Sequence, residues 1–173
     1  KFSWKDREVD LTLAKEDHAN VLASFAAFQE KVRDYTRGCL RIEAEVVTVK
    51  EPLTRFSGTE SFFPNATDLP YDFSKIERGK YDSVFAYTLC GSSKGEIPRA
   101  MLGGTYGGDV GPAGAGYSAI LYLEGDLAPR TGECELHEWL HQVDWMFASV
   151  QGWPGELFPD PDSGRTEDDA RPG

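Results

Sequence analysis

The pattern of apolar and polar positions along the chain predicts four strands. Residues 7–13 and 40–49 alternate apolar with polar side chains, as a strand with one buried face does. Residues 81–89 and 117–126 are rich in aromatic and aliphatic residues, which favours buried strands. The sequence therefore contains enough strand-forming segments to build a sheet.

Two further segments show the three- and four-residue apolar spacing of amphipathic helices. In residues 15–38 this spacing defines one apolar face, made of Val21, Leu22, Phe25, Phe28, Val32 and Tyr35. Asp17 is expected to cap the start of this helix and Gly38 to end it. Residues 133–147 form the second predicted helix. Its expected sheet-facing stripe is apolar and consists of Leu136, Leu140, Val143 and Phe147.

The connections between these elements are proline- and glycine-rich. Residues 50–80 show no period and are predicted to form a long irregular connection, packed by Phe56, Phe62, Phe63 and Tyr71. The glycine-rich residues 103–116 are interpreted as a flexible loop and not as a phosphate cradle, because no Gly-Lys-Ser/Thr follows them. The element order predicts an α/β (α+β) fold. It has a mixed twisted sheet, an N-terminal helix and a C-terminal helix.

Composition and charge bear on the binding partners and the location of the protein. The 173-residue chain has a formal net charge of −11 and no cluster of Lys and Arg, which argues against nucleic acid. No apolar run approaches the roughly 20 residues of a membrane span. The three cysteines, Cys39, Cys90 and Cys134, are scattered and form no CxxC, and Asn65 opens a glycosylation sequon. These features slightly favour a secreted or extracellular location over the cytoplasm, and they leave the oligomeric state open.

The candidate chemistry lies in the sequence HEWLH. His137 and His141 are four residues apart, so a helix places both imidazoles on one face, where they can bind one metal ion. Glu138 is one residue further round and can take a proton from a metal-bound water. Two histidines of a metal-free helix would need other partners for their ring nitrogens, so a metal site is favoured over structural histidines.

HEWLH resembles the HExxH signature of the zincin metallopeptidases. The resemblance covers these five residues and the order of the elements around them. It implies a zincin-like fold in which His137 and His141 bind Zn²⁺ and Glu138 is the general base. It also implies that the strand before the helix, residues 117–124, forms the upper rim of a cleft and pairs with an extended peptide substrate.

The third zinc ligand does not follow the metzincin pattern. Asp144 and Phe147 stand where that pattern has a glycine and a histidine. The remaining candidates are acidic. The resemblance favours Asp160, because some glutamate-ligand zincins carry their third ligand at a similar distance beyond the second histidine, and Asp162 and Glu156 follow it. Asp144 fits better as a partner of a histidine ligand than as a ligand, because it lies about 10 Å along the axis from the first histidine.

Four other residues are candidates for roles near the site. Cys134 is interpreted as a small buried side chain in preference to a ligand, because free cysteines are among the most buried residues. An oxyanion stabiliser is expected from Tyr106 or Tyr117, since no tyrosine follows the second histidine. His18 lies in the first predicted helix with no motif around it.

The sequence thus predicts two regions and one function. Residues 1–150 are expected to form a zincin-like catalytic domain. Residues 151–173 are an acidic, Pro/Gly-rich C-terminal segment, which contains the favoured candidate for the third ligand. The hypothesis is a zinc-dependent metallopeptidase acting on a peptide or protein substrate. The alternative is a non-catalytic zincin-like binding domain whose metal is structural or lost. Hydrolysis of a non-peptide amide would use the same site.

Overall fold

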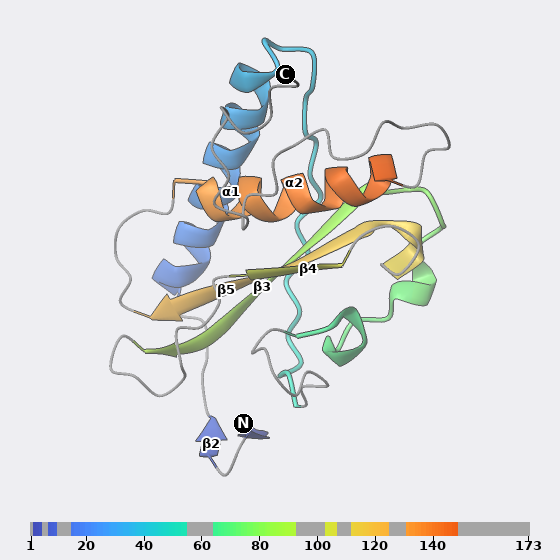
Figure 1. Ribbon diagram of the computed structural model, residues 1–173. Helices are drawn as coiled ribbons and strands as arrows, with labels where there is room; N and C mark the ends of the chain where they lie inside the picture. The colour runs from blue at the N-terminus through green and yellow to red at the C-terminus, as the bar shows by residue number, and fades with distance from the viewer. Residues whose placement is uncertain are drawn as a thin grey trace, which may run out of the picture.

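The computed structural model describes residues 2–4, 7–9, 15–54, 64–92, 103–106, 112–124 and 131–148. The strands are β1 (Phe2–Trp4), β2 (Arg7–Val9), β3 (Ser83–Ser92), β4 (Gly103–Tyr106) and β5 (Gly116–Glu124). The helices are α1 (Lys15–Tyr35) and α2 (Glu133–Ala148). Short 3-10 turns occur at Ala66–Asp68, Phe73–Lys75 and Pro112–Gly114. Figure 1 shows their arrangement.

The main sheet has the order β3-β5-β4. β3 runs parallel to β5, whereas β4 pairs with β5 antiparallel. β1 and β2 form a separate antiparallel pair. The predicted α+β class, with a mixed sheet, an N-terminal helix and a C-terminal helix, is confirmed. Within the described residues, no helix is both long and apolar enough to cross a membrane.

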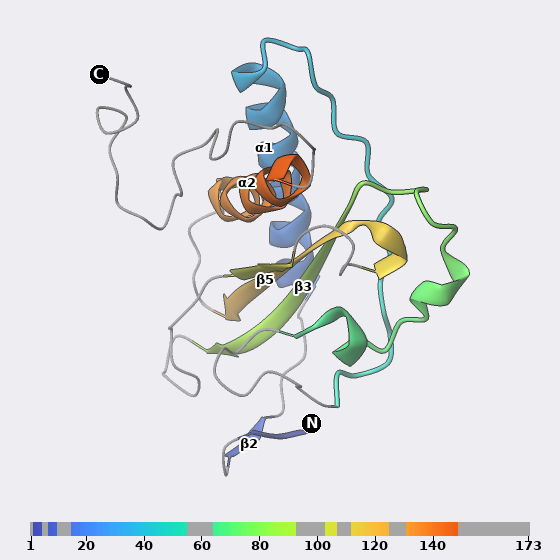
Figure 2. The ribbon, with the colours of Figure 1, turned by 45° about the vertical axis from the view of Figure 1, so that its right-hand side comes forward.

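Both helices lie on the same side of the β3-β5-β4 sheet (Figure 2). Aromatic rings join the layers: Phe28 of α1 lies 5.5 Å from Phe85 of β3 and 6.0 Å from Trp139 of α2, between ring centroids. Phe25 adds an edge contact to Phe85 at 5.7 Å. Such ring pairs stabilise by packing geometry as well as by burial. The apolar core therefore lies where α1 meets the sheet and α2.

The helix predicted at residues 15–38 is confirmed, with changes at its edges. Its buried face consists of Asp17, Val21, Ser24, Phe28 and Val32. Asp17 lies inside the first turn and not at the cap. Two members of the predicted apolar face are exposed, Leu22 at 40% and Tyr35 at 70%, because the helix buries a narrower stripe than the sequence suggested.

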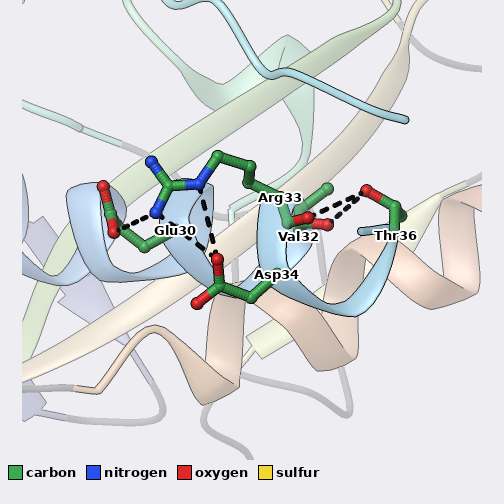
Figure 3. Close-up of polar contacts among 5 residues, drawn as sticks. All are labelled: Glu30, Val32, Arg33, Asp34 and Thr36. Carbon is green, nitrogen blue, oxygen red and sulfur yellow. Dashed lines mark hydrogen bonds and ion pairs between the residues drawn. The ribbon is translucent and has the colours of Figure 1, made fainter. Parts of the chain in front are cut away.

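The end of α1 is built from local contacts, shown in Figure 3. Arg33 Nη2 donates to Glu30 Oε2 at 2.7 Å, and Thr36 Oγ1 donates to the carbonyl of Val32 at 2.7 Å. Gly38 adopts φ +80° and its N–H donates to the carbonyl of Arg33 at 2.7 Å. A glycine in this left-handed conformation ends a helix by satisfying its last carbonyls. The predicted stop at Gly38 is confirmed.

The strand predicted at residues 40–49 is absent, and this prediction was wrong. The segment is irregular and its apolar side chains are exposed, Val46 at 62% and Val47 at 52%. Alternation alone does not make a strand, which needs a neighbouring strand for its backbone hydrogen bonds. Side chains anchor the segment instead: Gln29 Nε2 donates to the Ile42 carbonyl at 3.0 Å, and Glu45 accepts from Tyr81. That hydrogen bond, with the charge of nearby Lys80, lowers the pKa of Glu45.

The strands predicted at residues 81–89 and 117–126 correspond to β3 and β5, and part of the strand predicted at 7–13 corresponds to β2. The glycine-rich residues 103–116, predicted as a loop, contain β4, because backbone pairing with β5 does not require side chains. The irregular connection at 50–80 is confirmed where it is described. Three of its expected packing residues, Phe56, Phe62 and Phe63, lie outside the described residues.

The far face of the sheet is covered by this connection. Tyr117 of β5 is fully buried, and its hydroxyl donates to the carbonyl of Pro64 at 2.7 Å. Tyr71, the remaining expected packing residue, is half-buried and contacts Phe73, with ring centroids 4.9 Å apart. Because strand side chains alternate between faces, Tyr117 points away from the helices.

Gly132 fixes the place where α2 begins beside α1. It has φ +75°, and a Cβ there would lie 2.3 Å from the backbone nitrogen of Phe28 and 2.8 Å from the carbonyl carbon of Ala27. Both the backbone conformation and the space therefore require glycine. An ion pair between Lys31 and Glu133 at 3.2 Å lies at the same crossing.

We expect Gly132→Ala to lower the free energy of unfolding by about 2–5 kcal/mol, from left-handed backbone strain and overpacking together. Gly79→Ala is the matched control, because Gly79 has φ +81° but nothing within 4 Å of the added Cβ. The control should lose only about 1–2 kcal/mol. Urea unfolding measures both, and equal losses would contradict the close approach of the two helices.

Candidate metal site

The two histidines of HEWLH lie side by side on α2. Their Nε2 atoms are 3.2 Å apart, and their ring centroids are 4.8 Å apart with the rings almost perpendicular, at 84°. Both side chains are half-buried. The helical spacing of four residues brings His137 and His141 into this position, as expected for one helix face.

The separation of the two nitrogens fits a tetrahedral metal ion. Two nitrogen ligands about 2.0–2.1 Å from a tetrahedral zinc lie about 3.3–3.4 Å from each other. The Nε2 atoms of His137 and His141 are 3.2 Å apart. Both nitrogens could therefore bind a single zinc ion with little movement of either ring.

Glu138 lies beside the histidine pair and is almost fully covered, with 5% of its surface exposed. Its backbone carbonyl accepts a hydrogen bond from Ser118 Oγ of β5 at 3.4 Å. The glutamate is therefore on the side of α2 that rests on the sheet, next to the row that carries His137 and His141. A carboxylate in such a place is shielded from bulk water.

The side of α2 that rests on the sheet is polar, and the predicted apolar stripe was wrong. Its buried residues are Glu135, Glu138 and Gln142, which are 0%, 5% and 1% exposed. The leucines and the valine of the predicted stripe are only half-buried, and Phe147 is exposed. The reason lies in the strands, whose hydroxyl groups give the side chains of Glu135 and Gln142 hydrogen-bond partners.

Gln142 is held between two serines. Ser83 Oγ of β3 donates to Gln142 Oε1 at 2.6 Å, and Gln142 Nε2 donates to Ser118 Oγ of β5 at 2.6 Å. The register pairs Ser83 with Gly116 and Phe85 with Ser118, so these residues share the face beneath the helices. One side chain of α2 thus connects to both parallel strands.

Glu135 makes a second buried contact with the sheet. The hydroxyl of Tyr87 of β3 donates a hydrogen bond to Glu135 Oε1 at 3.0 Å. Oε2 of the same carboxyl has no hydrogen-bond partner among the described residues. Glu135 and Gln142 are two helical turns apart, so α2 is attached to the sheet on either side of the HEWLH segment.

The described residues contain no group of three or more His, Cys, Asp or Glu that could hold a metal ion. Asp160, Asp162 and Glu156, the candidate third ligands, lie outside the described residues. Asp144 is half-buried on α2, three residues beyond the second histidine. His18 lies on α1 and contacts Thr48 at 3.4 Å, away from the pair.

Two further expectations can be compared with the structure. Tyr117 cannot serve as an oxyanion stabiliser, because it is fully buried on the opposite face of the sheet and donates to Pro64. The side chain of Tyr106 is outside the described part. Cys134 is half-buried and forms no disulfide with a described residue, so its predicted role as a small buried side chain holds only in part.

The predicted upper rim of the cleft is wrong for residues 117–120 of β5. This part of β5 pairs with β3 on one edge and with β4 on the other. An extended peptide cannot add to it. β4, which pairs with β5 on one side, is the strand of this sheet at the edge beside α2. The prediction failed because the glycine-rich segment was interpreted as a loop.

Several residues that position the helix were missed from the sequence. Glu135, Glu138 and Gln142 are spaced three and four residues apart and so share one helix face. Glu138 was expected only as a general base, and no contact with the sheet was expected for Glu135 or Gln142. The signal in the sequence that could have indicated this contact was the presence of Ser83 and Ser118 in the two predicted buried strands.

No family model, no curated protein and no solved structure matches this chain.

The buried contact between Tyr87 and Glu135 generates a stability prediction. Tyr87→Phe should lower the free energy of unfolding by about 1–3 kcal/mol, because it leaves a fully buried carboxyl without its hydrogen bond. Tyr87→Phe combined with Glu135→Met should recover most of that loss, since no buried polar group then remains unpaired. Urea unfolding measures both variants, and a double variant that is no more stable than Tyr87→Phe would contradict the interaction.

Proposed function

We propose that this chain is a zinc-dependent metallopeptidase with a zincin-like fold. The single observation that carries the proposal is the 3.2 Å separation of the Nε2 atoms of His137 and His141. It matches two ligands of one tetrahedral zinc, and Glu138 adjoins them on the same helix. A zinc ion held there would act as a Lewis acid, which lowers the pKa of a bound water toward about 7.

The residues of α2 then have separate tasks. His137 and His141 would hold the metal through Nε2, and each Nδ1 would then carry the ring proton. Glu138 accepts a proton from the attacking water and passes it to the leaving amine, as a general base and then a general acid. Its near-complete burial keeps competing water away from the carboxylate. Asp160 is the proposed third ligand, with Asp162 and Glu156 as alternatives.

The substrate in this proposal is an extended peptide that adds to the edge of β4. Backbone hydrogen bonds along a strand edge bind peptides without regard to most side chains. β4 pairs antiparallel with β5 and lies beside α2. A peptide at this edge would run close to the helix that carries the histidines. The edge of β4 replaces β5 in the peptide-binding role.

The proposal predicts about one zinc per chain after reconstitution, measured by metal analysis. Glu138→Gln should keep the metal and lower hydrolysis of a quenched fluorescent peptide library by about 10²–10⁴-fold, the usual contribution of a general base. His137→Ala should lose the metal. His18→Ala is the matched control, because His18 contacts Thr48 on another element, and it should keep both metal and activity.

Three outcomes would contradict the proposal or a part of it. A reconstituted protein that binds no zinc, with His137→Ala as stable as the wild type, would remove the metal site. Zinc that stays bound while Glu138→Gln hydrolyses peptide at the wild-type rate would assign the activity to another group. Bound zinc without any hydrolysis by the wild type would support the alternative, a binding domain with a structural metal.

A further inference from the structure

A directed chain of hydrogen bonds runs from β3 through α2 to β5 and back to α2. Ser83 Oγ donates to Gln142 Oε1 and Gln142 Nε2 donates to Ser118 Oγ, each at 2.6 Å. Ser118 Oγ in turn donates to the Glu138 carbonyl at 3.4 Å. Each hydroxyl donates one bond, so the three bonds are compatible with a single arrangement of protons. Gln142 is the member of this chain that joins the two strands to the helix.

Gln142 also fits its site closely. The side chain is 1% exposed, and a Cβ added to Gly116 of β5 would lie 2.2 Å from Gln142 Oε1. The amide therefore occupies space that any other residue at position 116 would fill. Hydrogen bonds to Ser83 and Ser118 and the close approach of Gly116 therefore hold the Gln142 amide in one position.

We infer that Gln142 is a positioning residue that sets the rotation of α2, and hence the direction in which His137 and His141 present a metal. This inference rests on the proposed function. Gln142 follows His141 directly, about 100° further round the helix, so holding one side chain fixes the other. A rotation of about 10° moves an atom about 6 Å from the helix axis by about 1 Å. Metal–ligand distances tolerate only about 0.2 Å.

A rotation of α2 changes the position of the site relative to groups outside the helix. A rotation of α2 carries His137, Glu138 and His141 together, so their mutual spacing stays the same. What changes is their distance to a third ligand elsewhere in the chain and to a peptide at the edge of β4. Loss of Gln142 should therefore weaken three-ligand zinc binding and slow hydrolysis, while the histidine pair remains intact.

Stability and positioning can be separated by a set of variants. Gln142→Met has nearly the same length and removes the amide that accepts from the Ser83 hydroxyl and donates to the Ser118 hydroxyl, so it should lower the urea midpoint. The triple variant Gln142→Met, Ser83→Ala, Ser118→Ala removes those hydroxyls and should recover most of the midpoint. Neither variant keeps the directional bonds. Both should therefore show zinc affinity and kcat/KM reduced about 10–100-fold, the usual effect of losing a group that orients ligands.

Controls and a milder variant complete the test. Ser24→Ala is the matched control: Ser24 is fully buried on α1, and its hydroxyl has no hydrogen-bond partner among the described residues. Its zinc affinity and kcat/KM should equal those of the wild type. Ser83→Ala alone removes one bond and should give a smaller decrease in kcat/KM at an unchanged folded fraction, measured by circular dichroism.

The outcomes distinguish this inference from the proposed function. A triple variant that regains wild-type zinc affinity and kcat/KM together with its urea midpoint overturns the positioning role and leaves the metallopeptidase proposal standing. The same holds for an unchanged kcat/KM in Ser83→Ala. A wild-type protein that binds no zinc and hydrolyses no peptide overturns the proposed function, and the inference with it. Reduced affinity and kcat/KM in a stable triple variant support the inference.

Discussion

Helix α2 rests on the sheet through carboxyl, amide and hydroxyl groups, and most other features of the molecule depend on that contact. Apolar contacts are non-directional and permit a helix to rotate or slide, whereas hydrogen bonds require a defined angle. Glu135 and Gln142 place such bonds two turns apart. The helix is therefore held in one rotation, with the residues of HEWLH between the two attachments.

The rest of the fold is held by ordinary packing. Phe28 of α1 touches both Phe85 and Trp139, so one aromatic side chain connects α1, the sheet and α2. Gly132 permits the close approach of the two helices at the start of α2. Packing and glycine thus set where α2 crosses α1, and the buried polar contacts set which of its faces meets the sheet. Both conditions have to be met before a site on α2 has a fixed direction.

Much of the fold followed from residue patterns, and the failures share one cause. The periodicity of residues 15–38 and 133–147 predicted both helices, because helical spacing is a local property. Residues 40–49 alternate as well as any strand in the chain, yet they lack a neighbouring strand. Residues 103–106 have weak strand propensity but pair with β5. Strand formation depends on a distant partner, which a local pattern does not contain.

The sequence by itself determined that two histidines share one helix face with a glutamate beside them, since spacing along a helix fixes relative direction. It also determined the α+β class, through the order of its periodic segments. Only the tertiary structure decided which face of α2 is buried. Glu135 and Gln142 are hydrophilic and buried. Their hydrogen-bond partners are Tyr87, Ser83 and Ser118, which are far away along the chain. A polar side chain is buried where it finds a hydrogen-bond partner, and only the tertiary structure brings a partner from a distant part of the sequence next to it.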